Sequence, residues 1–367
     1  MRSARIILHK SVAILFVAAI SLPMIVGVMQ ADLEISPTEK RVLAQWPQWA
    51  EEKDLKTFLS TLSSYVADQF GFRQYLISVN KKLKWFLGYS PSASVVRGED
   101  DWLFLKIQDP LLTQHKYGER EVENRLIKRA NYVRDMEMEM AKRGIAYQHI
   151  TASNKMTVYK QYLPTKFSLT NITASYEFYQ SQFTEEELSQ QVFSDRVLSL
   201  HKQEYKDQFY FKNDTHWNHL GAYLVFSESI ARLRRKHPEL EFDSPDKTFL
   251  VKQKHSGDLA GYLGLGNKLV ATEPQTNFRV CARRKATTAE RQGVNQSVCE
   301  RNRTIVLMIG DSFMANLMPF YSESIGKMYS VGQTISRQRL LKLVDEFNPD
   351  LVIEELAERH LPGLVPL

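Results

Sequence analysis

Residues 306–313 read Val-Leu-Met-Ile-Gly-Asp-Ser-Phe, and the rest of the chain is organised around them. The four apolar residues predict a short buried strand, and Gly-Asp predicts a turn directly after it. Apolar side chains then recur at helical spacing over residues 313–325, so a helix follows the turn. A serine at such a strand-to-helix turn is exposed beside free backbone N–H groups, which can hold an oxyanion. Ser312 is therefore the candidate nucleophile.

A serine hydroxyl is a weak nucleophile unless a base takes its proton. The candidate base lies well upstream, in the segment Phe211-Lys-Asn-Asp-Thr-His-Trp-Asn218. Asp214 and His216 are two positions apart at a turn, so the carboxylate can orient the imidazole while its other nitrogen faces outward. We therefore predict a catalytic triad of Ser312, His216 and Asp214. The plain alternatives are a surface His–Asp pair and a serine that only caps a helix.

The two motifs together resemble the SGNH-hydrolase-like domain of the alginate O-acetyltransferases of the AlgJ and AlgX type. The resemblance extends roughly over residues 40–362. Further segments of the chain fit the family's pattern: 65–73, 96–104, 154–164, 257–259, 349–353 and 358–359. The chain ends soon after this region, without the separate carbohydrate-binding domain of the AlgX type. In architecture it is therefore expected to be similar to the AlgJ type.

The alternation of elements predicts an α/β fold without help from the resemblance. A long helical pattern over 122–142 stops at Gly144 and is followed by a strand at 145–150; after Ser312 come a strand at 329–335, a helix at 336–347 and a strand at 351–353. Such alternation gives a parallel sheet covered on both faces. The resemblance implies a three-layer SGNH-hydrolase-like sandwich. Because the order here is Asp, His, Ser, and the serine comes first in ordinary SGNH esterases, it also implies circular permutation.

The activity that the resemblance implies is the transfer of acetyl groups to hydroxyls of an exported polysaccharide through an acyl-serine. The family works beside a membrane-bound O-acyltransferase that supplies the acetyl donor, so we expect that partner as well as the polysaccharide acceptor. A carbohydrate acetylesterase would use the same triad with water as acceptor. A non-catalytic component of a polysaccharide export complex is the third reading. The sequence alone does not choose among these.

Several residues outside the triad are candidates for substrate binding. Asn154 follows the strand at 145–150, at the end of a strand where α/β sheets bind ligands, and is a candidate oxyanion donor, with a turn role as the alternative. Lys155 beside it is positioned to meet an anionic group. Trp217 can stack on a sugar ring or pack in the core. The resemblance implies a substrate-contacting arginine after the serine helix, either Arg337 or Arg339. Glu358–Arg359 matches a landmark of the family, and an internal salt bridge explains this pair just as well.

Cofactors, metals and nucleic acid are not expected. His219 lies three residues after His216, but no third ligand with suitable spacing stands out, so no metal is predicted. The net charge is +6, and the chain carries no nucleic-acid-binding signature. A mild positive charge of this size is compatible with an acidic polysaccharide or a lipid surface.

The chain has two cysteines, Cys281 and Cys299, and their spacing suits no zinc or redox motif. In a compartment outside the cytoplasm they most simply form one disulfide, which would close a basic loop just before the strand that leads to Ser312. Two free thiols are the alternative.

The N-terminus predicts export. Ser11–Met29 is uncharged and long enough to span a bilayer as a helix, and it follows Arg2, Arg5 and Lys10. The positive-inside rule places these basic residues in the cytoplasm and the rest of the chain outside it. We expect an uncleaved anchor, because no clear cleavage site follows the run; a cleaved signal peptide is the alternative.

The domain organisation follows from these segments. Residues 1–30 are the predicted cytoplasmic N-terminus and transmembrane anchor, 31–52 a linker, and 53–367 the catalytic domain, in the periplasm of a bacterium with a single pass through the inner membrane. At its start, residues 55–70 and 72–87 have the apolar spacing of two helices. The lysines of the second can face lipid headgroups, although a solvated helix face is the simpler expectation.

Overall fold

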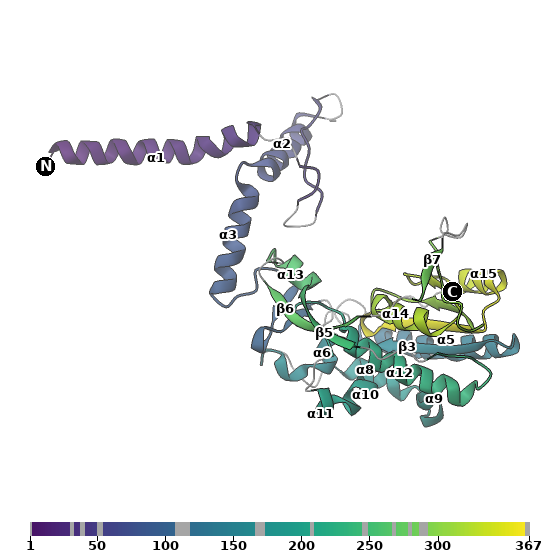
Figure 1. Cartoon of the computed structure of the whole chain (residues 1–367). Coiled ribbons are helices and arrows are strands. Elements are labelled where there is room, and N and C mark those ends of the chain that lie inside the picture. Colours follow the sequence, from purple (N-terminus) through teal and green to yellow (C-terminus); the bar gives the residue numbers. More distant parts are fainter. Residues whose placement is uncertain are drawn as a thin grey trace. The chain divides into compact units, whose positions relative to one another are not determined.

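The computed structural model describes residues 2–29, 33–36, 41–49, 54–106, 118–165, 173–205, 209–243, 249–265, 269–277, 281–285 and 293–363 (Figure 1). The chain separates into two compact units, which are described here one at a time. The first unit comprises Met1–Ser92 with Gly261–Leu265, and the second comprises Ala93–Ala260 with Gly266–Leu367. The predicted boundaries at residues 30 and 52 both fall within the first unit, and the division they propose stays a prediction.

The described residues of the first unit include the helices α1 (Arg2–Met29), α2 (Leu55–Gln69) and α3 (Arg73–Phe86). α1 contains an 18-residue window, Lys10–Gly27, that is long and apolar enough to cross a membrane. Asp54 caps α2 by accepting the backbone N–H of Thr57 at 2.8 Å. The predicted pair of helices at 55–70 and 72–87 is therefore present, separated by a turn at Gly71.

The second unit is organised around a sheet of seven strands. Their order is β4 (Val192–Phe193), β3 (Ala146–Ala152), β11 (Leu351–Ala357), β9 (Ile305–Ile309), β10 (Lys327–Val331), β8 (Asn295–Val298) and β7 (Arg283–Lys285). The five strands from β4 to β10 are parallel, while β8 and β7 pair antiparallel at one edge. β9, which leads to Ser312, lies between β11 and β10 in the interior of the sheet. The prediction of an α/β fold with a parallel-rich sheet is confirmed.

Helices cover both faces of this sheet, so the second unit has three layers. The side chains of β9 alternate between two buried apolar clusters: Val306 and Met308 belong to one, and Leu307 and Ile309 to the other. α12 (His219–Lys236) and α14 (Met314–Ser324) contribute to the first cluster. α5 (Glu119–Lys142) and α15 (Arg337–Phe347) contribute to the second. Gly144, just after α5, has a φ of +69°, which a C-terminal helix cap requires and glycine adopts without strain.

Smaller elements connect these layers. Two antiparallel hairpins stand apart from the large sheet, β1 (Val95–Arg97) with β2 (Leu103–Leu105) and β5 (Phe249–Ser256) with β6 (Val270–Asn277). The short helices are α6 (Lys155–Val158), α8 (Ala174–Ser181), α9 (Glu185–Gln190), α10 (Ser194–Leu200), α11 (Lys202–Tyr205) and α13 (Asp258–Tyr262), with 3-10 turns at Glu99–Asp101, Lys160–Tyr162 and Glu358–His360. The hairpin β5–β6 and the turn Glu358–His360 supply residues to the site described next.

Candidate active site

The turn after β9 holds Ser312 at the carboxyl edge of the parallel strands. Gly310 is needed there because a Cβ at this position would lie 2.6 Å from Oε2 of the buried Glu355. The backbone N–H of Asp311 donates to the same oxygen at 3.0 Å. The Asp311 carboxylate in turn accepts the backbone N–H of Phe313 at 2.9 Å. These bonds fix the turn and leave Ser312 exposed at the edge where α/β proteins bind ligands.

Ser312, His216 and Asp214 form one continuous hydrogen-bonded chain. Nε2 of His216 lies 2.7 Å from Oγ of Ser312, and Nδ1 lies 2.6 Å from Oδ1 of Asp214. The backbone N–H of His216 also donates to Oδ1 of Asp214 at 3.0 Å. The side chains of His216 and Asp214 are only 20% and 11% exposed. The structure thus brings together the three residues predicted as a triad, in the order that proton transfer from serine to histidine requires.

The second oxygen of Asp214 is held as firmly as the first. Oδ2 accepts a hydrogen bond from Nε2 of His255 at 3.1 Å and another from the backbone N–H of Asp258 at 3.0 Å. The His255 ring stacks on Phe211, with 3.8 Å between ring centroids. Burial by itself would raise the pKa of Asp214, but the hydrogen bonds from His216 and His255 outweigh it and hold the pKa well below its usual range. These hydrogen bonds therefore favour the carboxylate form of Asp214.

A second carboxylate lies beside the histidine. Asp258 accepts both the backbone N–H and the hydroxyl of Thr215, at 2.8 and 2.6 Å, and its Oδ2 is 3.9 Å from Nδ1 of His216. Burial and the negative charge of Asp214 both raise the pKa of Asp258. Asp214, His216 and Asp258 are close enough to share a metal ion. However, each oxygen of Asp214 already accepts two N–H groups, which is the bonding of a carboxylate that orients a histidine.

A buried lysine fixes the loop that carries Asp214. Lys155 is fully buried, and its Nζ donates to the carbonyl oxygens of Phe211, Lys212 and Asp214 at 2.7, 2.9 and 2.7 Å. The ammonium group also lies 5.3 Å from the ring centroid of Trp102. The predicted contact of Lys155 with an anionic group is therefore wrong. The loop carbonyls already occupy its donors, and the side chain has no exposed surface.

The three predicted substrate-binding residues have different surroundings. Trp217 has no exposed surface, and its indole N–H donates to the carbonyl of Phe313 at 3.1 Å, so it packs in the core and has no face open to a sugar. Asn154 is buried at the start of α6, where its backbone N–H donates to Glu358 at 2.7 Å. Arg337 begins α15, and its positive charge opposes the rise that burial causes in the pKa of Tyr132 of α5. Roles of Asn154 and Arg337 in substrate binding stay predictions.

The arginine that lies beside the serine is Arg359, which the sequence analysis did not assign to the site. Its Nη2 is 3.4 Å from Oγ of Ser312, and the guanidinium lies 5.0 Å from the ring centroid of Phe313. Its Nη1 is buried without a hydrogen-bond partner in the described part of the chain. Glu358 does not use its carboxylate for an ion pair with Arg359. That carboxylate accepts hydrogen bonds from the backbone N–H of Asn154 and the hydroxyl of Thr157 instead. The pairing of β11 with β9 brings Arg359 beside the serine, and no local sequence signal gives that pairing.

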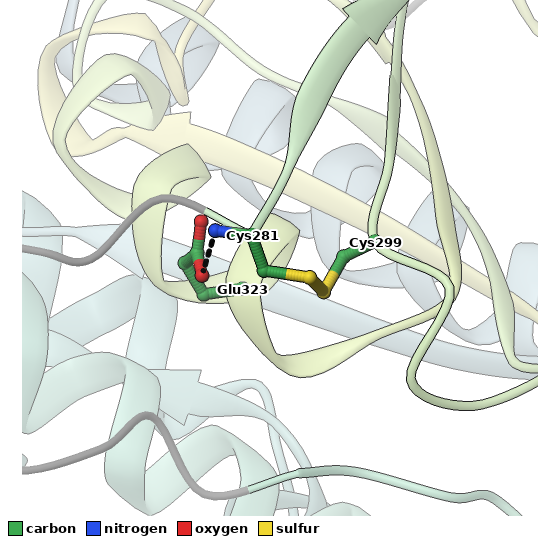
Figure 2. Close-up of side chains that lie close together, drawn as sticks. All are labelled: Cys281, Cys299 and Glu323. Atoms are coloured by element: carbon green, nitrogen blue, oxygen red, sulfur yellow. Dashed lines mark hydrogen bonds between the residues drawn. A yellow bond between two sulfur atoms is a disulfide. The ribbon is translucent and has the colours of Figure 1, made fainter.

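The two cysteines are joined by a disulfide, shown in Figure 2. Glu323 of α14 accepts the backbone N–H groups of Cys281 and Ala282 at 2.8 and 2.9 Å. Cys299 directly follows β8. The bridge and these two hydrogen bonds therefore attach the edge strands β7 and β8 to the helix that follows Ser312.

The fold is similar to that of solved structures, including the following two. The O-acetyltransferase domain of Pseudomonas putida AlgJ is 19% identical with a TM-score of 0.50, over 75% of this chain and 94% of that one. Bacillus cereus PatB1 is 11% identical with a TM-score of 0.53, over 74% of this chain and 97% of that one. No curated protein sequence matches significantly. The sequence model of the SGNH hydrolase-like domain of acetyltransferase AlgX matches residues 95–358, and the chain therefore belongs to this family of SGNH hydrolase-like acetyltransferase domains.

Proposed function

We propose that this protein is an extracytoplasmic O-acetyltransferase that acetylates hydroxyl groups of an exported polysaccharide. The observation that carries the proposal is the hydrogen-bonded chain from Asp214 through His216 to Ser312. As Ser312 Oγ attacks the acetyl carbonyl of the donor, His216 takes its proton and Asp214 stabilises the imidazolium. His216 then returns the proton to the leaving group, which departs and leaves an acetyl-serine.

The second half of the reaction reverses these roles. A sugar hydroxyl loses its proton to His216 and attacks the acetyl carbonyl, and Ser312 takes the proton back as it leaves. In both halves the carbonyl oxygen gains negative charge. The backbone N–H of Ser312 has no acceptor among the described residues, and Nη2 of Arg359 lies 3.4 Å from Oγ. These two groups are the proposed stabilisers of that charge.

The setting of the reaction follows from α1 and from the family. α1 is the proposed single-pass anchor in the bacterial inner membrane, with the second unit on the periplasmic side. A disulfide between Cys281 and Cys299 suits that oxidising compartment. A membrane-bound O-acyltransferase is the proposed source of the acetyl group, and the P. putida AlgJ domain, which is an O-acetyltransferase, supports transfer as the reaction.

One observation favours hydrolysis as the competing reaction. Ser312 is exposed, so water reaches the acyl-serine unless the acceptor excludes it. The chemistry of an acetylesterase would be identical up to the second step, where water replaces the sugar hydroxyl.

The test uses purified protein without residues 1–30, an acetyl ester, and an oligosaccharide that is present or omitted. Acetylated sugar with little free acetate is the expected result, whereas free acetate in equal amounts with and without sugar would identify an esterase. Ser312→Ala should abolish turnover, and Ser199→Ala, the same change at an exposed serine of α10, should not. Absence of turnover in the wild type, combined with unchanged polymer acetylation by Ser312→Ala in cells, would leave a non-catalytic role.

A further inference from the structure

Helix α3 exposes an apolar stripe along its surface. Four apolar residues spaced three or four positions apart form one stripe on its surface. Their exposed fractions are high: Leu76 51%, Val79 40%, Leu83 54% and Phe86 85%. The half-buried positions on the other side are mixed in character: Gln74, Ile77, Ser78, Lys81 and Trp85. A continuous apolar stripe of α3 thus faces outward although the helix also partly buries Ile77 and Trp85, and such exposure is costly in water.

The charges of α3 flank this stripe. The helix carries Arg73, Lys81, Lys82 and Lys84 and no acidic residue. At 100° per residue, Lys82 stands on one side of the stripe and Lys84 on the other, and both are exposed. An apolar stripe bordered by lysines is the pattern of a helix that lies at a membrane surface rich in anionic lipid. The expectation of a solvated lysine face is therefore incomplete, because the same exposed surface is largely apolar.

The structure also places α3 at the end of the candidate membrane span. A Cβ at Gly71, in the turn before α3, would overlap the carbonyl oxygen of Pro23 and lie 2.9 Å from Cβ of Val26. A Cβ at Gly27 would lie 3.0 Å from the carbonyl oxygen of Gln69. The turn is therefore packed backbone to backbone on the last turns of the Lys10–Gly27 window. Within this unit α3 runs across the direction of α1 rather than alongside it (Figure 1), as a helix lying along the surface of a bilayer that α1 crosses would do.

We propose that α3 lies in the membrane–water interface of the extracytoplasmic leaflet, with its apolar stripe at the acyl-chain boundary and Lys82 and Lys84 at anionic headgroups. This inference rests on the proposed membrane anchoring by α1. Tyr75 and Tyr89, which are 66% and 67% exposed at the two ends of the helix, supply the amphipathic rings that favour headgroup depth. The lysines select anionic lipid as the occupant over a neutral apolar protein surface.

The test uses the full chain reconstituted into vesicles of phosphatidylcholine and phosphatidylglycerol. Single cysteines for a nitroxide label are introduced as Leu83→Cys or Phe86→Cys on the stripe, Ser78→Cys on the other side of α3, and Leu15→Cys within α1; the native cysteines are in a disulfide and stay unlabelled. Labels at positions 83 and 86 should collide more with dissolved oxygen, which concentrates in lipid, than with a water-soluble nickel chelate. The label at 78 should not show this preference.

The outcomes separate the possible occupants. Labels at 83 and 86 that meet the nickel chelate freely would overturn the proposal, as would labels shielded from both probes, which would mean that a second copy or another part of the chain covers the stripe. A label at position 15 that reads as aqueous would overturn the anchoring by α1 instead, whatever α3 does. When phosphatidylglycerol is added to the wild-type protein, the ratio of lipid-facing to water-facing label at position 83 should rise roughly fivefold per lysine. In the variant Lys82→Glu/Lys84→Glu, this ratio should no longer depend on phosphatidylglycerol.

Discussion

At the scale of single residues, the site depends on how completely Asp214 is held. Its two oxygens accept four hydrogen bonds, from the ring and backbone of His216, from the ring of His255 and from the backbone of Asp258. A carboxylate that is fixed in this way keeps the imidazole in the tautomer that can take a proton from Ser312. Asp214 acts through His216, and His255 acts through Asp214, so His255 is a positioning residue.

Replacement of His255 tests this arrangement. His255→Ala removes a hydrogen bond to a charged group, and Asp214 gains freedom to turn away from His216, so we expect kcat on an acetyl ester to fall by roughly 10- to 100-fold with KM little changed. His255→Gln, which can still donate a hydrogen bond, should recover part of the loss. His237→Ala, at a histidine paired with Glu239 on the surface, is the matched control. A wild-type kcat for His255→Ala would contradict the positioning role.

Lys155 offers a second prediction at this scale. Lys155→Met keeps the length of the side chain but leaves three buried carbonyl oxygens of the Asp214 loop without their charged donor. We expect the free energy of unfolding to fall by about 3 kcal/mol or more, with loss of activity as the loop relaxes. Denaturant unfolding measures the first effect and ester turnover the second. Lys202→Met, at a half-buried lysine with one long contact to the carbonyl of Val158, should change stability far less.

Glu358 should make stability depend on pH. Burial raises its pKa to about 7 from the ordinary value of 4.5, although hydrogen bonds from Asn154 and Thr157 act in the opposite direction. The folded chain then binds this proton more tightly than the unfolded chain, so the contribution to stability is full below pH 4.5 and is lost as the pH rises through 7. The loss amounts to roughly 3 kcal/mol.

The variant Glu358→Gln isolates this titration. Its unfolding free energy, measured in denaturant at pH 5 and pH 8, should differ less between the two values than that of the wild type, with the gain at pH 8. Glu346→Gln, at an exposed position of α15, should retain the wild-type slope. An unchanged slope in Glu358→Gln would show that the buried carboxyl titrates near its ordinary range.

At the scale of elements, apolar periodicity predicted the helices and strands that have a regular pattern of buried residues. It did not predict elements whose position depends on contacts with residues far away in the sequence. α5, β3 and β9 follow from apolar spacing and from Gly144, because those signals are local. The hairpin β5–β6 that carries His255 gave no such signal. Its position depends on Asn213, whose side-chain amide donates to the carbonyls of His255 and Leu269 at 2.9 and 2.6 Å. Because Asn213 and the two strands are far apart in the sequence, their contact gives no recognisable sequence pattern in either segment.

The same distinction applies to the candidate site. Ser312, His216 and Asp214 were predictable because two short motifs fix their spacing and chemistry. Trp217 was left between two roles, since an aromatic side chain next to a catalytic histidine suits a sugar face as well as a core, and only its complete burial decides. Arg359 required the order of the strands, because it reaches Ser312 from the end of β11, which pairs with β9.

The junction between β5 and α13 supports a prediction about backbone fit. A Cβ at Gly257 would overlap the carbonyl oxygen of Asn213 and lie 2.7 Å from Cβ of Asp214. Gly257→Ala should therefore push Asp214 out of line with His216, and we expect kcat to fall at least tenfold while the fold, judged by circular dichroism, persists. Gly261→Ala, four residues later, meets no atom within 4 Å and is the matched control. Equal activity of the two variants would show that the Asp214 loop can shift while Asp214 stays aligned with His216.

At the scale of the whole molecule, the proposed chemistry and the proposed membrane attachment belong to different parts of the chain. Both apolar clusters that sandwich the large sheet draw their buried residues from the second unit, beginning at Val96 and ending at Leu361. The candidate span and the exposed stripe of α3 belong to the first unit. The proposed reaction is therefore expected to need only the second unit, while delivery of the acetyl group at the membrane is expected to need both.

A chain of residues 93–367 tests this division. Since its core is complete without residues 1–92, we expect it to fold cooperatively and to turn over a soluble acetyl ester at a rate within a few-fold of the longer protein, with Ser312→Ala in the same chain as the inactive control. In cells, an exported form of this chain should fail to acetylate the polysaccharide, because it no longer stays beside the membrane partner that would load Ser312, and effective concentration is lost with the tether. Restoring α1 together with α2 and α3 should restore acetylation. Full acetylation by the detached chain would instead mean that the donor reaches Ser312 by free diffusion and that the first unit serves another purpose.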